Sequence, residues 1–184
     1  MEKNIIKIYC DGSARNNKNM DKRLFGSFSS VVHINDKPLF DITEGFENVT
    51  NNQMEVMGFI FPMFVLKKQF NEIYSVSNIE VISDSQYLIK GINEWLNGWI
   101  RKNWHTTTGL VKNKELWVMI VSILNDIKQK NNDYLCTWVR GHDGHPLNES
   151  CDSNCTEKVK KLDSGIEEPL CFEEVSSKLI KYFR

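Results

Sequence analysis

The sequence predicts an α/β domain built on a mixed five-stranded sheet that is flanked by helices. Two observations point to this class. Three strand-like segments follow one another near the start of the chain with polar connections between them, which is typical of an antiparallel meander. Farther along, strand-like segments alternate with segments of helical periodicity, which is typical of parallel strands packed against helices.

The three meander strands are expected at residues 4–10, 25–34 and 39–46. The first is rich in isoleucine and leads directly into Asp11. A polar stretch at residues 15–22 separates it from the second strand, and the turn-forming sequence NDKP separates the second strand from the third.

The first helix is expected to begin at the polar residues 50–52, which supply capping side chains. Pro62 is expected to kink or break this helix, because proline lacks the backbone N–H that a helix interior needs. Residues 64–70 then continue as helix, and a fourth strand at residues 79–83 ends at Asp84.

Four further helices and one strand complete the predicted fold. One helix starts at Ser85, and a second is capped by Asn113. A fifth strand at residues 134–139 precedes a helix whose first position is Pro146. A last helix is expected at residues 172–183.

The composition is that of a soluble globular protein, with 41% hydrophobic and 26% charged residues. No run of 18 apolar residues occurs and the N-terminus does not resemble a signal peptide, so we expect a cytoplasmic protein without membrane segments. The five cysteines include no CxxC pair, which argues against a disulfide framework or a zinc site. Cys151 and Cys155 are expected in the core.

The formal net charge is only −1, but the charges are unevenly distributed. No acidic residue lies between Glu94 and Glu115, whereas that interval holds several basic residues, which we call the basic segment. Its members are Arg101, Lys102, Lys112 and Lys114. Such a segment can bind phosphates independently of sequence, and a solvated loop is the alternative.

Four acidic residues lie where predicted elements begin or end. Asp11 and Asp84 end the first and fourth strands. Glu55 lies near the start of the first helix, and Asp152 lies in the second turn of the helix after the sequence GHDGH. If the two strands are neighbours, the acids form a cluster that repels itself and is stable with cations bound. Oxygen ligands without histidine or thiolate favour Mg²⁺ or Mn²⁺.

The residues around these acids resemble the signature segments of type 1 ribonuclease H, in the bacterial form that has a basic protrusion. The segments are DGS at residues 11–13, TNNQME at 50–55, DSQY at 84–87 and GHDGHPLNESCD at 141–152. The resemblance covers residues 4–162. It implies a ribonuclease H-like fold, with residues 1–164 as the catalytic domain and residues 165–184 as a C-terminal helical extension of unknown role.

The resemblance also implies an endonuclease that hydrolyses the RNA strand of RNA–DNA hybrids and leaves 5′-phosphate and 3′-hydroxyl ends. The catalytic metal ligands would be Asp11, Glu55, Asp84 and Asp152. They would hold two Mg²⁺ ions, or Mn²⁺, about 4 Å apart at the scissile phosphate. His142 would assist proton transfer or product release, with an ordinary loop histidine as the alternative. His145 is expected to be structural.

Residues that would contact the hybrid follow from the same resemblance. Those that would read the minor groove, where RNA exposes its 2′-hydroxyl groups, are Asn17, Asn51, Asn52 and Gln86. Thr50 and Asn113 would hold a phosphate of the DNA strand, and Trp95 would lie against a DNA sugar. The residues that would add phosphate contacts are Arg101, Lys102 and Lys112. For the asparagines, the alternative is a turn or cap role.

Other interpretations are an integrase or junction resolvase that cuts DNA, a non-catalytic nucleic-acid-binding module, and a domain released from a larger polymerase. The TNNQME and GHDGH segments argue against the first, and the presence of all four acids argues against the second. The start at Met1 argues against the third. We expect a monomer with no obligate protein partner.

Overall fold

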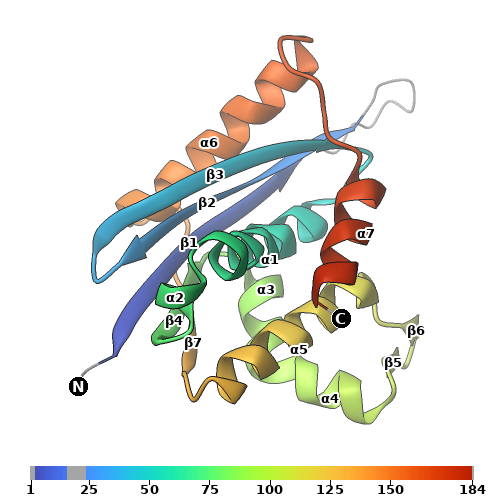
Figure 1. Cartoon of the computed structure of the whole chain (residues 1–184). Coiled ribbons are helices and arrows are strands. Elements are labelled where there is room, and N and C mark those ends of the chain that lie inside the picture. The colour runs from blue at the N-terminus through green and yellow to red at the C-terminus, as the bar shows by residue number, and fades with distance from the viewer. Residues whose placement is uncertain (1–2, 16–23, 184) are drawn as a thin grey trace.

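The computed structural model describes residues 3–15 and 24–183. Within them, a five-stranded sheet has the strand order β3-β2-β1-β4-β7, and β5 and β6 form a separate small hairpin (Figure 1). The strands of the main sheet are β1 (Asn4–Ala14), β2 (Phe25–Ile34), β3 (Lys37–Glu47), β4 (Ser77–Ser83) and β7 (Tyr134–Trp138). The hairpin strands are β5 (His105–Thr106) and β6 (Gly109–Leu110).

The strand directions confirm the predicted mixed sheet. β1 pairs antiparallel with β2, and β2 pairs antiparallel with β3, as expected for a meander. β1 and β4 are parallel neighbours in which Tyr9 pairs with Ile82, and β4 is parallel to β7. Asp11 and Asp84 each follow this pair by two residues, so both lie at the same end of the sheet.

The first strand is longer than its sequence predicted. It continues past Asp11 to Ala14, because pairing with β2 extends to the pair Ala14 and Gly26. Asp11 therefore lies inside a strand and does not end it. The backbone of Asp11 is therefore held in place by its pairing with β2.

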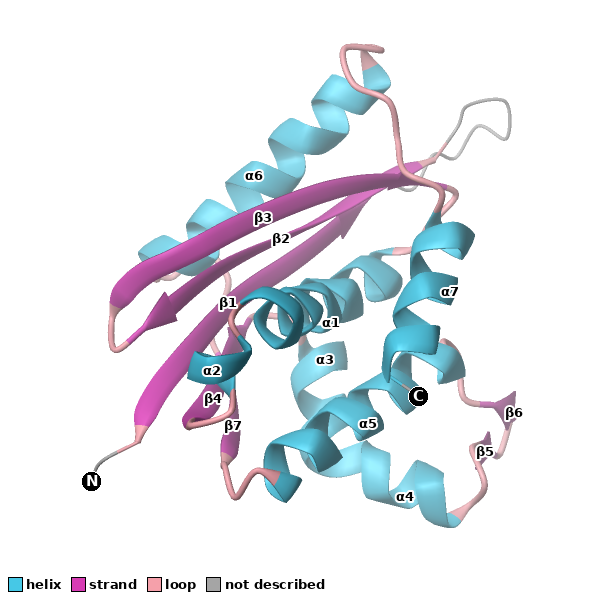
Figure 2. Cartoon of the chain, in the orientation of Figure 1, coloured by secondary structure: helices cyan, strands magenta, loops and turns pink. Residues whose placement is uncertain are grey.

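Helices cover both faces of the sheet (Figure 2). They are α1 (Asn51–Gln69), α2 (Asn71–Tyr74), α3 (Gln86–Lys90), the π-helical segment η1 (Gly91–Trp95), α4 (Leu96–Arg101), α5 (Lys114–Gln129), α6 (Pro146–Asp163) and α7 (Phe172–Phe183). α6 packs on β1, β2 and β3 from one side, and α1 packs on β1 and β2 from the other. α5 packs on α1, and α7 on α5. None of the helices in the described ranges is long and apolar enough to cross a membrane.

Pro62 does not break α1, which contradicts the expected interruption. A proline at this position removes the hydrogen bond to the carbonyl oxygen of Gly58, four residues earlier. The hydroxyl of Ser30 on β2 donates a hydrogen bond to that oxygen at 2.6 Å instead. The sheet therefore satisfies the group that the proline leaves unpaired, and the helix continues to Gln69.

The helix expected after Ser85 contains a π-helical stretch at Gly91–Trp95. A Cβ atom at Gly91 would overlap the ring of Trp117, so the close approach of α5 requires glycine here. The expected apolar face is otherwise present, since Leu88, Ile92 and Leu96 are buried.

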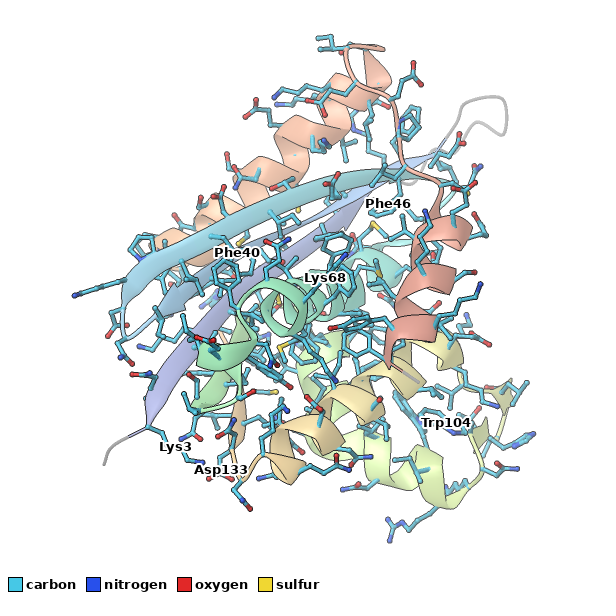
Figure 3. The ribbon with its side chains drawn as sticks, in the orientation of Figure 1. Lys3, Phe40, Phe46, Lys68, Trp104 and Asp133 are labelled. Carbon is cyan, nitrogen blue, oxygen red and sulfur yellow. The ribbon has the colours of Figure 1, made fainter. Side chains whose placement is uncertain are left out.

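The final helix, α7, adds to the core. Phe172, Leu179 and Phe183 are buried, and the ring of Phe172 packs edge-on against Phe46 at 5.9 Å between centroids. Phe46, labelled in Figure 3, lies near the end of β3, close to the start of α1. The helix α7 thus packs against β3 and α5 of the described fold.

Candidate active site

Asp11 lies at the centre of the predicted acidic cluster. It is only 9% exposed, and burial together with the charge of Asp84 raises its pKa to about 7. A backbone hydrogen bond at Gly12 opposes this rise, while Asp152 and Glu55 add to it. The structure therefore brings the four predicted carboxylates close enough for the other three to act electrostatically on Asp11.

Asp84 follows β4, the parallel neighbour of β1. Its backbone carbonyl accepts a hydrogen bond from the indole N–H of Trp138 at 2.9 Å, which ties it to the end of β7. A Cβ atom at Gly141 would lie 2.6 Å from Oδ2 of Asp84. A glycine at 141 thus leaves room for this carboxylate beside the loop that precedes α6.

Glu55 is positioned by the start of α1. Thr50 caps this helix in a capping box with Gln53, so the first turn is fixed. Asn51 donates to Oε1 of Glu55 and Ser85 donates to Oε2, both at 2.6 Å. Burial raises the pKa of Glu55, whereas these two hydrogen bonds lower it. Ser85 thereby joins α1 to the loop that carries Asp84.

Two glycines let α1 lie directly against β1. A Cβ atom at Gly12 would overlap the backbone of Met54 and Glu55. A Cβ atom at Gly58 would lie 3.1 Å from the backbone oxygen of Asp11. The helix that carries Glu55 therefore requires glycine at position 12 for its close approach to the strand that carries Asp11, and a side chain at position 58 would make this contact tighter.

Asp152 comes from α6 on the opposite face of the sheet. The thiols of Cys151 and Cys155 contact the backbone oxygens of Tyr9 and Asp11 at 3.4 and 3.6 Å, so this turn of α6 lies against β1. Both cysteines are buried and free, as predicted.

His142 precedes α6 in a left-handed backbone conformation, with φ of 55°. Its side chain is 82% exposed, and its Nδ1 lies 3.9 Å from Oδ2 of Asp152. The histidine is thus at the margin of the cluster and free to rotate toward a ligand. His145 is exposed and makes no capping hydrogen bond to α6.

The cluster is not a preassembled metal cage. Across residues 3–15 and 24–183, no three histidine, cysteine or acidic side chains converge closely enough to hold an ion as they stand. The donor set nevertheless fits a hard divalent cation, because all four groups offer oxygen and the neighbouring carboxylates add to the rise that burial causes in the pKa of Asp11. Cations would offset the repulsion and draw the carboxylates together.

The predicted substrate-binding residues lie around this cluster and beyond it. Those exposed at the starts of α1 and α3 are Thr50, Asn51, Asn52 and Gln86. Trp95 is half-buried against Tyr87 and Trp99. The exposed members of the basic segment are Arg101, Lys102 and Lys112, whereas Lys114 is half-buried. Asn17 lies outside the described residues.

Asn113 does not cap α5 with its side chain, which corrects the sequence expectation. Its backbone is left-handed, with φ of 56°, and its carbonyl oxygen accepts the N–H groups of Leu116 and Trp117. Its side chain turns instead to the hydroxyl of Tyr87, at 3.3 Å. Tyr87 was not among the predicted site residues, although it belongs to the DSQY segment. Ser85 was predicted only as the start of a helix.

Comparisons with known proteins agree with this geometry. The RNase H family model matches residues 3–160. A ribonuclease H from Thiobacillus denitrificans is 37% identical over 83% of this chain and 91% of its own length. One from Geotalea uraniireducens is 33% identical over 80% of this chain and 88% of its own.

Solved structures share the fold at lower sequence identity. LC9-RNase H1, described as a type 1 RNase H with the type 2 active-site motif, matches with a TM-score of 0.66 and 19% identity, over 90% of this chain and 74% of that one. LC11-RNase H1 in complex with an RNA/DNA hybrid matches with a TM-score of 0.62 and 18% identity, over 85% and 97%. The family model and the sequence relatives together show that this chain is a member of the ribonuclease H family.

Proposed function

We propose that this protein is an endonuclease that hydrolyses the RNA strand of RNA–DNA hybrids with two divalent metal ions, leaving 5′-phosphate and 3′-hydroxyl ends. The observation that carries the proposal is that Asp84, Asp152 and Glu55 lie near enough to the buried carboxylate of Asp11 to add to the rise that burial causes in its pKa. The curated relatives that share its family are named as ribonucleases H, and the LC11 enzyme was solved with an RNA/DNA hybrid.

The four acids would hold Mg²⁺, with Mn²⁺ as an alternative. When bound, such ions activate water and neutralise charge on the scissile phosphate. Asp11 would supply a ligand from β1 and Asp84 one from the residue that follows its parallel neighbour β4, so the sheet sets their spacing. Glu55 is held in place by Asn51 and Ser85. His142, exposed and 3.9 Å from Asp152, is placed to take up or deliver a proton at the edge of the site.

Hybrid recognition would extend outward from the acids. Because the hydrogen bond from Ser85 to Glu55 joins the starts of α1 and α3, the polar residues there lie beside the cluster. The proposed readers of the minor groove are Asn51, Asn52 and Gln86, together with Asn17. Thr50 and Asn113 would bind a DNA phosphate, and Trp95 a DNA sugar. The basic segment would contact further phosphates.

We also propose a cytoplasmic monomer whose catalytic domain spans residues 1–164, with residues 165–184 as a stabilising extension. The burial of Leu179 and Phe183 supports a structural role for that extension.

Cleavage of matched substrates tests the function. Labelled RNA–DNA hybrid, RNA duplex and DNA duplex of one sequence are incubated with Mg²⁺, with Mn²⁺ and with EDTA. We expect cutting of the RNA strand of the hybrid alone, dependent on the added ion, with 5′-phosphate products. Equal cutting of the DNA duplex would favour the resolvase alternative, and hybrid binding without cutting would favour a non-catalytic module.

A further inference from the structure

The hydroxyl of Tyr87 connects the start of α3 to the start of α5. It accepts hydrogen bonds from the indole N–H of Trp117 at 2.9 Å and from the side-chain amide of Asn113 at 3.3 Å. It also lies 3.2 Å from the backbone carbonyl of Lys112, to which it donates. A tyrosine hydroxyl can donate one hydrogen bond and accept two, so every hydrogen-bonding position of this group is occupied.

The side-chain amide of Asn113, in contrast, keeps hydrogen-bonding positions that this network does not occupy. One of its two N–H groups is held by Tyr87, and its other polar positions make no hydrogen bond within residues 3–15 and 24–183. Its left-handed backbone and the missing cap bond mean that α5 does not fix this side chain. Tyr87 is therefore the group that sets where the remaining amide N–H points.

Tyr87 is also firmly placed. Its ring packs edge-on against Trp117 at 5.3 Å between centroids and lies 6.4 Å from Trp95. Trp117 is completely buried, and Tyr87 is the second residue of α3, just after Ser85. A phenylalanine would fill the same ring space, so packing alone does not account for the hydroxyl.

We infer that Tyr87 is a positioning residue that orients the amide of Asn113 toward a phosphate of the bound nucleic acid and links this contact to the loop that carries Asp84. The inference rests on the proposed function, because it assumes that Asn113 contacts the hybrid. The link is direct: Asp84, Ser85 and Tyr87 lie within four consecutive residues, and Ser85 in turn holds Glu55. Tyr87 would thus fix the distance between the cutting site and one phosphate contact.

The variant Tyr87→Phe removes only the hydroxyl. A single neutral hydrogen bond corresponds to roughly a fivefold change in an equilibrium constant, so the hybrid dissociation constant should rise about fivefold. The cleavage rate at saturating hybrid should stay near that of the wild type, because the four acids are unchanged. Tyr74→Phe is the matched control. It also removes a tyrosine hydroxyl that makes a hydrogen bond, here to Asp126, and should destabilise the fold without weakening hybrid binding.

A double-mutant cycle with Asn113→Ala separates positioning from general loss of stability. Each single variant should weaken binding by a similar factor, and the double variant should be no weaker than Asn113→Ala. In the free protein, NMR signals of the Asn113 side-chain amide should shift and narrow in Tyr87→Phe, and should stay unchanged in Tyr74→Phe.

The outcomes distinguish a failure of the proposed function from a failure of the role inferred for Tyr87. Failure of the wild type to prefer hybrid over both pure duplexes would overturn the proposed function. Hybrid binding by the wild type with an unaltered dissociation constant in Tyr87→Phe would overturn this inference alone. Multiplying effects in the double variant, or an unchanged Asn113 amide signal, would overturn it as well.

Discussion

The hydroxyl of Ser85 donates a hydrogen bond to the carboxylate of Glu55 at 2.6 Å, and the same oxygen accepts the backbone N–H of Leu88 at 3.0 Å. One side chain thus caps α3 and holds an acid that belongs to α1.

Ser85→Ala should lower the hybrid cleavage rate by about tenfold, because Glu55 loses the partner that fixes its orientation. It should also lower the free energy of unfolding by about 1 kcal/mol, because α3 loses its N-cap. Ser85→Thr retains a hydroxyl and should restore most of the rate in a steady-state assay. Equal loss in both variants would contradict a role for the hydroxyl.

Asp84→Asn should abolish metal-dependent cleavage of the hybrid and stabilise the metal-free protein. The substitution preserves the shape of the side chain but removes a charge that raises the pKa of Asp11. Turnover and thermal melting in EDTA are measured on the same preparations. Asp41→Asn, an exposed acid on β3, is the control and should leave both properties unchanged. Activity within tenfold of the wild type would remove Asp84 from the list of metal ligands.

His142→Ala should slow turnover by roughly ten- to a hundredfold, since a positioned acid or base contributes on that order or more. The exposed side chain makes no packing contribution that would be lost, so the melting temperature should not change. The neighbouring His145→Ala variant, also in an exposed position, serves as the comparison. Identical pH–rate profiles for the wild type and His142→Ala would show that this histidine takes no part in proton transfer.

Replacing all four residues of the basic segment with glutamine should weaken hybrid binding and leave the maximal rate nearly intact. Each phosphate contact adds about 0.7–0.9 to the slope of log affinity against log salt, so the slope should fall by up to about three units. The matched control replaces four exposed lysines elsewhere, namely Lys37, Lys68, Lys178 and Lys181. If both sets changed the slope equally, the effect would come from net charge and not from this segment.

Asp126 gives the stability of the fold a defined dependence on pH. Burial raises its pKa, but hydrogen bonds from Tyr74 and Lys67 outweigh this and hold it below its usual value of 3.8. A carboxylate whose pKa is lower in the folded state stabilises the fold above pH 4, and this contribution disappears as the pH falls through the folded-state pKa. Asp126→Asn should therefore cost on the order of 1 kcal/mol in urea unfolding at pH 6, with a smaller cost at pH 3. A cost that is constant from pH 6 to pH 3 would contradict this assignment.

The parts of the structure that follow local rules were predictable from the sequence. The strand-like runs and the polar or turn-forming residues between them placed β2 at its observed bounds and β1 and β3 within a few residues. Long-range contacts explain the differences. Pro62 stays helical because Ser30, from another element, satisfies Gly58. Asn113 adopts a left-handed backbone conformation that the residues next to it in the sequence do not predict.

The candidate site was predictable as a set of residues but not as an arrangement. The motifs identified the four acids, and the adjacency of β1 and β4 explains why Asp11 and Asp84 approach each other. The supporting contacts could not be inferred in this way. Ser85 and Tyr87 act through partners that are 30 and 26 residues away in the chain. Such pairs become visible only when helices from separate parts of the sequence are placed together.

The burial of the cysteines that hold α6 against β1 also determines which thiols of the protein react with oxidants. A thiol reacts as its thiolate, and burial raises the pKa of Cys151 and of Cys136 to about 12. Peroxide should therefore modify the exposed Cys171 first and spare the strand that carries Asp11. The rate at which Cys151 and Cys155 become reactive to a thiol reagent would then report how often α6 separates from β1, with no substitution needed to introduce a reactive group.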